Sequence, residues 1–325
     1  LMLVISITVL SFAQIIRREQ RQSLDNQLSS QAFYAAESGI NQTRKYIADK
    51  WLSNGEIPKD KEECGYDADY PEFETTKTID AATNTKFTCL LVMGSPKSLK
   101  YDLSPSAGSK VFPIFAESGT ISRLDVSWTP STTNAPRTGC PTSGAAPAAL
   151  PRANDWPCRG YGLIRIDLVP VDNMSREGMM RNMFTAFLSP ASPGSTSPLS
   201  FNGLGTNVHS GLANQGARTA ASCGDSECTV TINNMSSGRY YARVSTMYRE
   251  TSLSVVARNS VGGVISLIGA QVVIDSTGRS QDVLRRVQVR VPLVNDGFHP
   301  DYGVQSTDSM CKVITTFPGY PIAGC

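Results

Sequence analysis

The side chains of this chain with the clearest chemistry are its eight cysteines, none of which lies in the first fifty or so residues. No two of them have the Cys-x-x-Cys spacing of zinc or thioredoxin sites, and the two histidines are far from them in the sequence. An even set of this kind predicts disulfides, with free buried thiols as the alternative. Because disulfides persist in oxidising compartments, we expect the cysteine-bearing part outside the cytoplasm.

Cysteines that neighbour one another in the sequence are the expected partners, because short loops close at the lowest entropic cost. The predicted pairs are Cys64 with Cys89, Cys140 with Cys158, Cys223 with Cys228, and Cys311 with Cys325. Residues 129–157 are rich in Pro, Thr, Ala and Gly, and residues 189–222 in Ser, Gly and Asn. Both stretches predict long surface loops, the first of them stapled by a disulfide.

Three acidic residues, Asp67, Asp69 and Glu72, could supply carboxylate oxygens to a calcium ion. The glycine and the terminal bidentate glutamate of an EF-hand loop are absent from this stretch. A solvated acidic turn is therefore the preferred interpretation, and we expect no metal site.

Residues that could act in catalysis are few. The sequence has no Gly-x-Ser-x-Gly elbow and no His-Glu-x-x-His motif. His299-Pro300-Asp301 predicts a surface turn, and Glu37 a solvated or salt-bridging helix residue. Gly203-Leu204-Gly205 is not followed by the Gly-Lys-Ser/Thr of a nucleotide site. The sequence thus predicts no enzyme, no catalytic residue and no cofactor.

The charge of the chain also excludes one class of partner. The formal net charge is +2, and charges of both signs are mixed along the sequence. Nucleic-acid binding needs a clustered basic face, so we expect no nucleic-acid partner. The densest basic group, Arg285-Arg286 with Arg290, lies in an alternating pattern that predicts a solvated strand face.

The first fifty or so residues predict one long helix with two different parts. Residues 1–16 carry no charge, and no proline precedes Pro58. The residues expected to lie in a membrane or a filament core are Leu1, Leu3, Val4, Ile5, Ile7, Val9, Leu10, Phe12, Ile15 and Ile16. A cleaved signal peptide and a simple single-span anchor are the alternatives for this apolar run.

From Arg17 onward, apolar residues recur at helical spacing on one face. The residues expected to pack on a sheet are Leu28, Ala32, Ala35, Ala36, Ile40 and Ile47. The helix should end at Ser53-Asn54-Gly55, which is a stop signal. The basic residues Arg17, Arg18 and Arg21 favour the cytoplasmic side. The cysteines place the body outside, and a removed basic leader would reconcile the two signals.

Strand-like alternation predominates after the helix, most regularly in residues 240–292, which predict an antiparallel meander with one buried face. The amphipathic part of the helix is its expected cover. The predicted fold class is therefore α+β, a long N-terminal helix packed on an antiparallel sheet with long disulfide-stapled loops. We expect residues 1–27 to be the membrane or filament-core part, 28–55 the sheet-packing part and 56–325 an extracellular β-rich body.

An uncharged apolar segment followed by an amphipathic continuation with the motif Gln-Ala-Phe-Tyr-Ala-Ala-Glu-Ser-Gly-Ile at residues 31–40 resembles a PilX-type type IV pilin. The resemblance covers roughly the first fifty residues. It implies that the helix is first held in the membrane and later bundled in a filament core. Type IV pilins commonly carry a glutamate a few residues into the mature chain, whereas here Ile5 stands near that place and the first acid is Glu19.

The resemblance implies a structural subunit of an extracellular type IV pilus on the bacterial cell surface, with adhesion or twitching motility as its use. Its partners would be copies of itself or other pilins in a helical filament, the cytoplasmic membrane before assembly, and a host-cell surface. Two other classes stay open: a tip pseudopilin of a type II secretion machine, and a single-span membrane-anchored extracellular receptor or enzyme.

Overall fold

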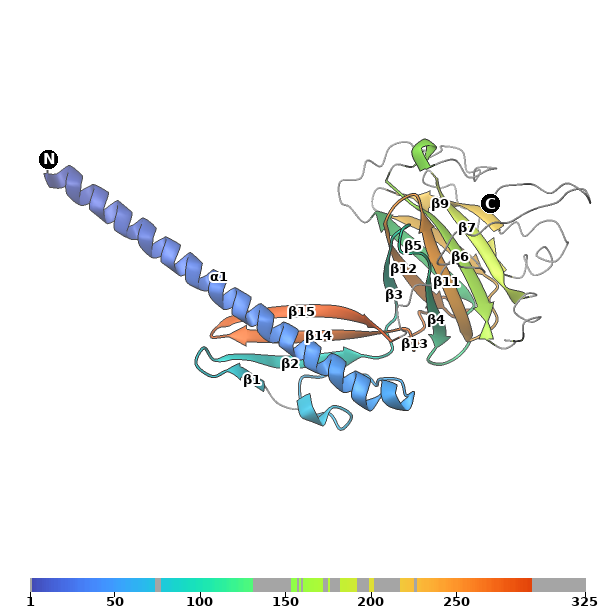
Figure 1. Cartoon of the computed structure of the whole chain (residues 1–325), viewed down its shortest axis with the longest axis horizontal. Helices are drawn as coiled ribbons and strands as arrows, with labels where there is room; N and C mark the ends of the chain where they lie inside the picture. Colours follow the sequence, from blue (N-terminus) through green and yellow to red (C-terminus); the bar gives the residue numbers. More distant parts are fainter. Residues whose placement is uncertain are drawn as a thin grey trace, which may run out of the picture.

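The computed structural model describes most of the chain up to Leu293. The described residues are 2–73, 77–130, 153–156, 158, 160–171, 175, 182–191, 199–201, 217–224 and 227–293, and the side chains of 2–10, 77, 217 and 218 lie outside this set. One long helix leads into two sheets: the smaller lies along the C-terminal half of the helix, and the larger lies beyond the smaller (Figure 1).

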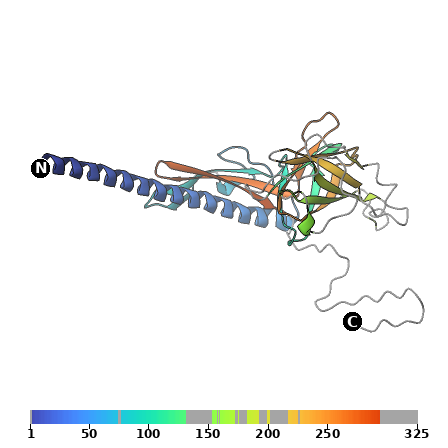
Figure 2. The ribbon, with the colours of Figure 1, turned by 90° about the horizontal axis from the view of Figure 1, so that it is seen from above.

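The helix α1 (Met2–Lys50) runs for 49 residues. At ~1.5 Å per residue its length is about 74 Å. A short 3-10 turn, η1 (Leu52–Asn54), follows it, and Gly55 then adopts the left-handed conformation and donates its N–H to the carbonyl of Leu52. The predicted stop signal is thus confirmed. Figure 2 shows that the N-terminal part of the rod projects well beyond both sheets.

The small sheet lies under α1 and contains four antiparallel strands. They are β1 (Lys77–Asp80), β2 (Thr85–Met93), β14 (Gln271–Ser280) and β15 (Val283–Pro292), in the order β1-β2-β14-β15. Strand β14 pairs with β15 along its whole length and with β2 on its other side. The sheet therefore joins one segment that follows the helix to another almost 200 residues further along the chain, as the pairing of Ser280 with Thr85 shows.

The large sheet contains the remaining eleven strands and curls until it is nearly closed. They are β3 (Leu99–Leu103), β4 (Lys110–Ala116), β5 (Arg123–Pro130), β6 (Leu163–Pro170), β7 (Phe184–Ala191), β8 (Leu199–Ser200), β9 (Ala217–Cys223), β10 (Cys228–Asn233), β11 (Arg239–Met247), β12 (Thr251–Arg258) and β13 (Leu267–Ile268). Their order is β13-β4-β11-β6-β7-β9-β10-β5-β12-β3, with β8 beside β10. Strands β7 and β9 pair in parallel, as do β8 and β10.

Each sheet has its own apolar core. The inward faces of the large sheet bring together side chains such as Trp128, Ile166 and Val244. A second core lies between α1 and the small sheet and contains Ile47 and Ile274. Strands with one apolar face thus bury that face in two ways in this chain: against the helix in the small sheet, and against other strands in the large sheet.

The predicted α+β fold class is wrong. The described structure is mostly β, with 47% strand against 23% helix, and a nearly closed sheet dominates it. The physical reason is that a single helix is too narrow to cover all fifteen described strands. One buried face of α1 covers only the small sheet, so the other strands bury their apolar faces by curling around one another.

The expected C-terminal meander is also wrong in its partners. Strand β11 lies between β4 and β6, and β12 lies between β5 and β3, so neither joins the small sheet. Residues 189–222, expected to be one long loop, contain β9 and the end of β7. The alternation of apolar and polar residues determines which side of a strand is buried, but it does not determine which strand lies beside it.

Disulfides tie both sheets locally. Cys64 is bonded to Cys89 of β2, across 25 residues of sequence, and Cys223 to Cys228 across five. These are two of the predicted pairs. Cys158 is disulfide-bonded as well. The predicted partner of Cys158, Cys140, lies outside the described residues, as does the predicted pair of Cys311 with Cys325.

We expect the two disulfides to differ in their effect on stability. In the chain-entropy model a loop of 25 residues contributes about 3.5 kcal/mol and a loop of five about 2 kcal/mol. Replacing Cys64 and Cys89 by Ala should therefore lower the melting temperature more than replacing Cys223 and Cys228 does. Calorimetry of the two double variants measures the difference. An equal or reversed order would contradict the loop-length argument.

Candidate functional site

The helix α1 has one free part and one docked part. Residues 11–27 are exposed on all sides, although they include large apolar side chains. Phe12 is 67% exposed and Leu24 is 54% exposed. Leu28 is half-buried, and from Ala32 onward one face of the helix is buried. The change from rod to docked helix therefore falls within about one turn.

The docked face is a stripe of small and branched side chains. Its buried members are Ala32, Ala35, Ala36, Ile40, Thr43, Ile47 and Trp51. Ile40 and Ile47 share a core with Phe87 and Val272 of the small sheet. Thr43, which the apolar pattern did not include, donates its hydroxyl to the carbonyl of Gly39 at 2.7 Å. This bond satisfies a polar group that would otherwise be buried without a partner.

At the N-terminal end of the docked face, the helix backbone comes very close to the sheet. A Cβ atom placed on Gly278 of β14 would lie 1.9 Å from the carbonyl oxygen of Ala32 and 2.5 Å from the amide nitrogen of Ala36. A Cβ atom on Gly39 would lie 2.5 Å from the hydroxyl oxygen of Ser276. Gly278 therefore needs glycine, because the atoms it meets are backbone, whereas a methyl group at Gly39 would require the Ser276 side chain to move. The sequence signal at Gly39 was a lone glycine within a helix, whereas Gly278 lies in Ser276-Thr277-Gly278-Arg279, a composition that indicates a turn although β14 continues to Ser280.

Polar side chains fix the register of the helix at the same end. The Ser280 hydroxyl donates to the side-chain oxygen of Gln31 at 2.9 Å, and the guanidinium of Arg285 donates to the Ser29 hydroxyl at 2.7 Å. Hydrogen bonds of this kind have a preferred geometry, which apolar contacts lack. They therefore oppose sliding of the helix along β14 and β15.

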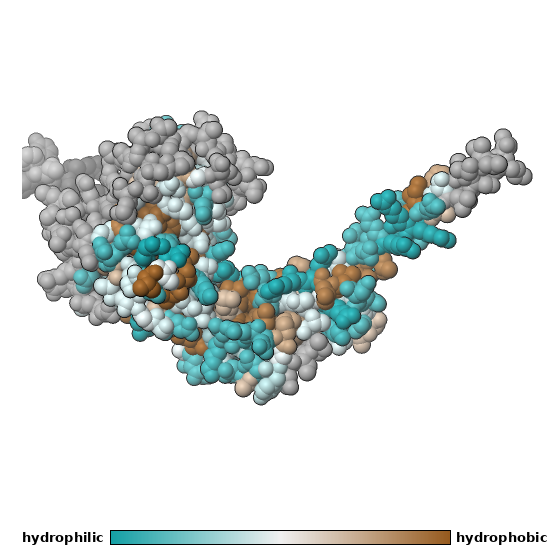
Figure 3. All heavy atoms as spheres, turned by 180° about the vertical axis from the view of Figure 1, so that it is seen from behind, coloured by the Kyte–Doolittle hydropathy of each residue, from teal (hydrophilic) through white to brown (hydrophobic). Residues whose placement is uncertain are grey.

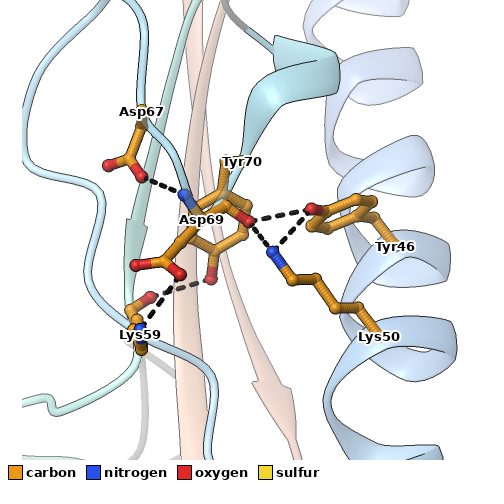
Figure 4. A network of polar contacts seen from close by, with 6 residues as sticks. All are labelled: Tyr46, Lys50, Lys59, Asp67, Asp69 and Tyr70. Carbon is orange, nitrogen blue, oxygen red and sulfur yellow. Dashed lines mark hydrogen bonds and ion pairs between the residues drawn. The ribbon is translucent and has the colours of Figure 1, made fainter.

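A second polar network holds the C-terminal end of the docked face in place (Figure 4). The carbonyl of Asp69 accepts hydrogen bonds from the Tyr46 hydroxyl, at 2.8 Å, and from the Lys50 ammonium group. The carboxylate of Asp69 pairs with Lys59 at 3.0 Å. Tyr70, fully buried behind them, donates its hydroxyl to the carbonyl of Lys59 at 2.8 Å. The segment that follows the helix is thus bound back onto its last turns.

The acidic residues of this segment have structural roles. The Asp67 carboxylate accepts the backbone N–H of Asp69 at 2.8 Å. Burial, and then the negative charges of Asp60 and Asp67, raise the pKa of Tyr70 above its ordinary value. Among the described residues, no three His, Cys, Asp or Glu side chains are grouped so that they could hold a metal ion.

The other residues considered for chemistry give no site. Glu37 is exposed on the outer face of α1. His209, His299 and the glycines at 203 and 205 lie outside the described residues.

The free part of α1 and its outer face carry exposed apolar and basic side chains. Ile15 and Ile16 are about half exposed, and Tyr34, next to Phe33 on the outer face, is 65% exposed. Arg17, Arg18 and Arg21 follow directly after the apolar side chains and are also exposed. Figure 3 shows hydrophobic patches on the rod between hydrophilic ones.

Within the described part of the chain, no helix has both the length and the apolar character that a membrane crossing requires. Comparison with known protein families, curated proteins and solved structures gives no match to this chain. The class that the fold defines is a mostly β protein with one projecting helix. The functional argument therefore rests on the geometry of that helix.

We expect the close approach at Gly278 to be essential for docking. Gly278→Ala places a methyl group against backbone atoms of α1, so the helix must shift, at a cost of about 1–3 kcal/mol. Denaturant unfolding followed by circular dichroism measures this cost. The control is Gly65→Ala, because nothing lies within 4 Å of a Cβ atom there. Equal stability of the two variants would show that the contact is not tight.

The raised pKa of Tyr70 predicts a loss of stability in alkali. The folded protein holds the phenolic proton more tightly than the unfolded chain, which loses it near pH ~10. The free energy of unfolding should therefore be unaffected by this group below that pH and fall above it. Tyr70→Phe should make the fall shallower, whereas Tyr34→Phe, at an exposed tyrosine, should not. Unfolding titrations at pH 8 and pH 10.5 test this, and identical slopes in the wild type and Tyr70→Phe would contradict it.

Proposed function

We propose that this chain is a structural subunit of an extracellular type IV pilus and that α1 is its assembly element. The observation that supports the proposal is the division of the helix. Its second half is bound to the small sheet by buried contacts, whereas residues 11–27 extend away from every other described part of the chain.

The free half of the rod needs a partner on energetic grounds. Full burial of a large apolar side chain stabilises by roughly 1.5–3 kcal/mol. Phe12, Ile15, Ile16 and Leu24 are each more than half exposed, so this free energy is not recovered within one chain. A bilayer before assembly and the rods of neighbouring subunits afterwards would both cover these residues. The apolar residues 1–10, which precede them in the sequence, would extend the same surface.

The remainder of the chain suits exposure on a cell surface. Disulfides at Cys64–Cys89 and Cys223–Cys228 favour an oxidising compartment, which supports a body outside the cytoplasm. The large sheet has its own core and lies beyond the docked end of the helix, away from the free rod (Figure 1). In a filament built on the rods, this sheet would face outward, where it could take part in adhesion.

The two halves of the helix should respond differently to change. Removing the chain before Leu28 should leave a soluble, folded monomer, because the docked stripe begins after that point. Ile40→Asp or Ile47→Asp should unfold the helix and the small sheet, since burying an unpaired charge costs several kcal/mol of a typical total of ~5–15. Tyr34→Asp is the matched control, because it adds the same charge to the exposed face. Circular dichroism and size-exclusion chromatography separate these outcomes. Aggregation of the truncated chain with normal folding of Ile40→Asp would contradict the proposed packing.

Filament formation itself tests the function. Surface filaments sheared from cells should contain this chain by peptide identification. Phe12→Asp with Ile15→Asp should remove it from the filaments while the disulfide-bonded body stays folded. Gln14→Asp, at an already polar position of the same turn, should be tolerated better. If the chain is absent from every filament, or if an unrelated anchor in place of residues 1–16 preserves function, the chain is an anchored receptor or enzyme instead.

A further inference from the structure

A polar cleft of about 780 Å³ lies where the outer face of the large sheet meets the small sheet. Strands β3, β12 and β5 form one wall, and the end of β15 forms the other. Volumes of this size are typical of ligand sites, which often lie between structural units. The cleft takes no part in the docking of α1.

The strand register builds the first wall as two rows of polar side chains. Lys100, Ser254 and Ser127 are direct neighbours across the three strands. Asp102, Ser252 and Thr129 form the next row in the same way, and the Ser252 hydroxyl donates to the Asp102 carboxylate at 2.5 Å. Because side chains alternate along a strand, all six point to the same outer face.

Hydrogen bonds hold the two walls in place. The side-chain amide of Gln271 in β14 accepts from the backbone N–H of Lys100 at 3.0 Å and donates to its carbonyl at 2.5 Å. The guanidinium of Arg290 in β15 donates to the carbonyl of Ser98 at 2.7 Å. The cleft is therefore held by contacts between residues that are remote in sequence.

Arg290 brings to the cleft a positive charge that no described residue pairs with. The sequence suggested a solvated strand face for it, yet the side chain is half-buried. Burial lowers the pKa of Arg290, and no ion pair with it occurs among the described residues. Its contacts within the described set are the carbonyl and hydroxyl of Ser98. Lys100, on the facing wall, is exposed and likewise has no ion pair in this part of the chain.

The groups around these cations indicate the class of ligand. Serine and threonine hydroxyls both donate and accept hydrogen bonds, and Asp102 accepts them. The lining residues Tyr101, Trp128 and Leu253 are buried toward the inside of the large sheet, and the exposed Pro292 of β15 offers apolar contact beside the polar groups. The acidic residues Asp102 and Glu227 at the cleft would repel a doubly charged phosphate more strongly than a singly charged carboxylate, and sugar hydroxyls would donate to them.

We propose that this cleft binds a carboxylate-bearing saccharide. Arg290 and Lys100 hold the carboxylate, because a guanidinium matches a carboxylate with two parallel hydrogen bonds. The hydroxyl rows of β12 and β5 and the carboxylate of Asp102 bind the sugar hydroxyls. The site is independent of filament formation, since none of its residues lies on α1.

The test uses the full chain in detergent solution and isothermal titration calorimetry. The probes are a galactose trimer in which one sugar is galacturonic acid, the neutral galactose trimer of the same linkage, and inorganic phosphate. The acidic trimer should bind at least about tenfold more tightly than the neutral one, because only its carboxylate can accept hydrogen bonds from the charged Arg290 and Lys100 side chains. Phosphate at the same concentration should not displace it. Absence of saccharide binding, equal binding of both trimers, or displacement by phosphate would overturn the proposal.

Variants assign the effect to the cleft. Arg290→Gln should abolish the preference for the acidic trimer, and Lys100→Gln should weaken it. Arg279→Gln is the matched control, since Arg279 lies on the neighbouring strand at the far end of the small sheet and outside the cleft. Lys100→Gln also guards against a folding effect, because no hydrogen bond within the described residues depends on the Lys100 ammonium group. An unchanged preference in both cleft variants would show that the acidic trimer binds elsewhere.

Discussion

The structure depends on the contact of the α1 backbone with β14 at Gly278. On the helix, Ala32 and Ala36 have only methyl side chains, and on the strand Gly278 has no side chain. The backbones of helix and strand therefore come closer together than any larger residue at position 278 would allow. Close packing maximises dispersion contacts, and it also leaves a single position for the helix. Hydrogen bonds from Ser280 to Gln31 at one end, and around Asp69 at the other, then fix that position along the sheet.

The remaining architecture follows from how much one helix can cover. Strands β2, β14 and β15 pack beneath the docked half of α1, β1 extends their sheet, and the other eleven strands curl into a nearly closed sheet around a separate core. The two sheets meet through polar side chains such as Gln271 and Arg290. The cleft lies at this junction, between β3, β12 and β5 on one side and the end of β15 on the other. Support of the rod and ligand recognition can thus occupy different parts of one chain.

Local features of this fold were predictable from the sequence. The absence of proline and the Ser53-Asn54-Gly55 signal gave the extent of the helix, and the spacing from Ala32 to Ile47 gave its buried face. Loop closure gave the pairing of Cys223 with Cys228, whose strands are hydrogen-bonded neighbours. In each case the information lies within a few turns or one hairpin.

Long-range features could not be predicted in this way. The pairing of β2 with β14 and the separate placement of β11 and β12 result from competition among many similar strands. The alternation of apolar and polar residues gives no preference among these possible partners. The cleft of Lys100 and Arg290 depends on that pairing, so the sequence indicated Arg290 only as part of a solvated basic strand face and did not indicate Lys100 at all. From its sequence context, Ser276-Thr277-Gly278-Arg279, Gly278 indicates a turn, whereas β14 continues through it to Ser280, and the helix residues that it contacts are about 240 residues earlier in the chain.

Hydrogen exchange along α1 in the full chain tests the central claim most directly. If the helix is fixed by its contact with β14, the amides from Ala32 to Ile47 should exchange as slowly as those of β14 and respond equally to denaturant. The amides from Arg17 to Leu24 should exchange faster and independently of the sheet. Uniform exchange along the whole helix, or faster exchange of the Ala32 to Ile47 amides than of β14, would contradict the account.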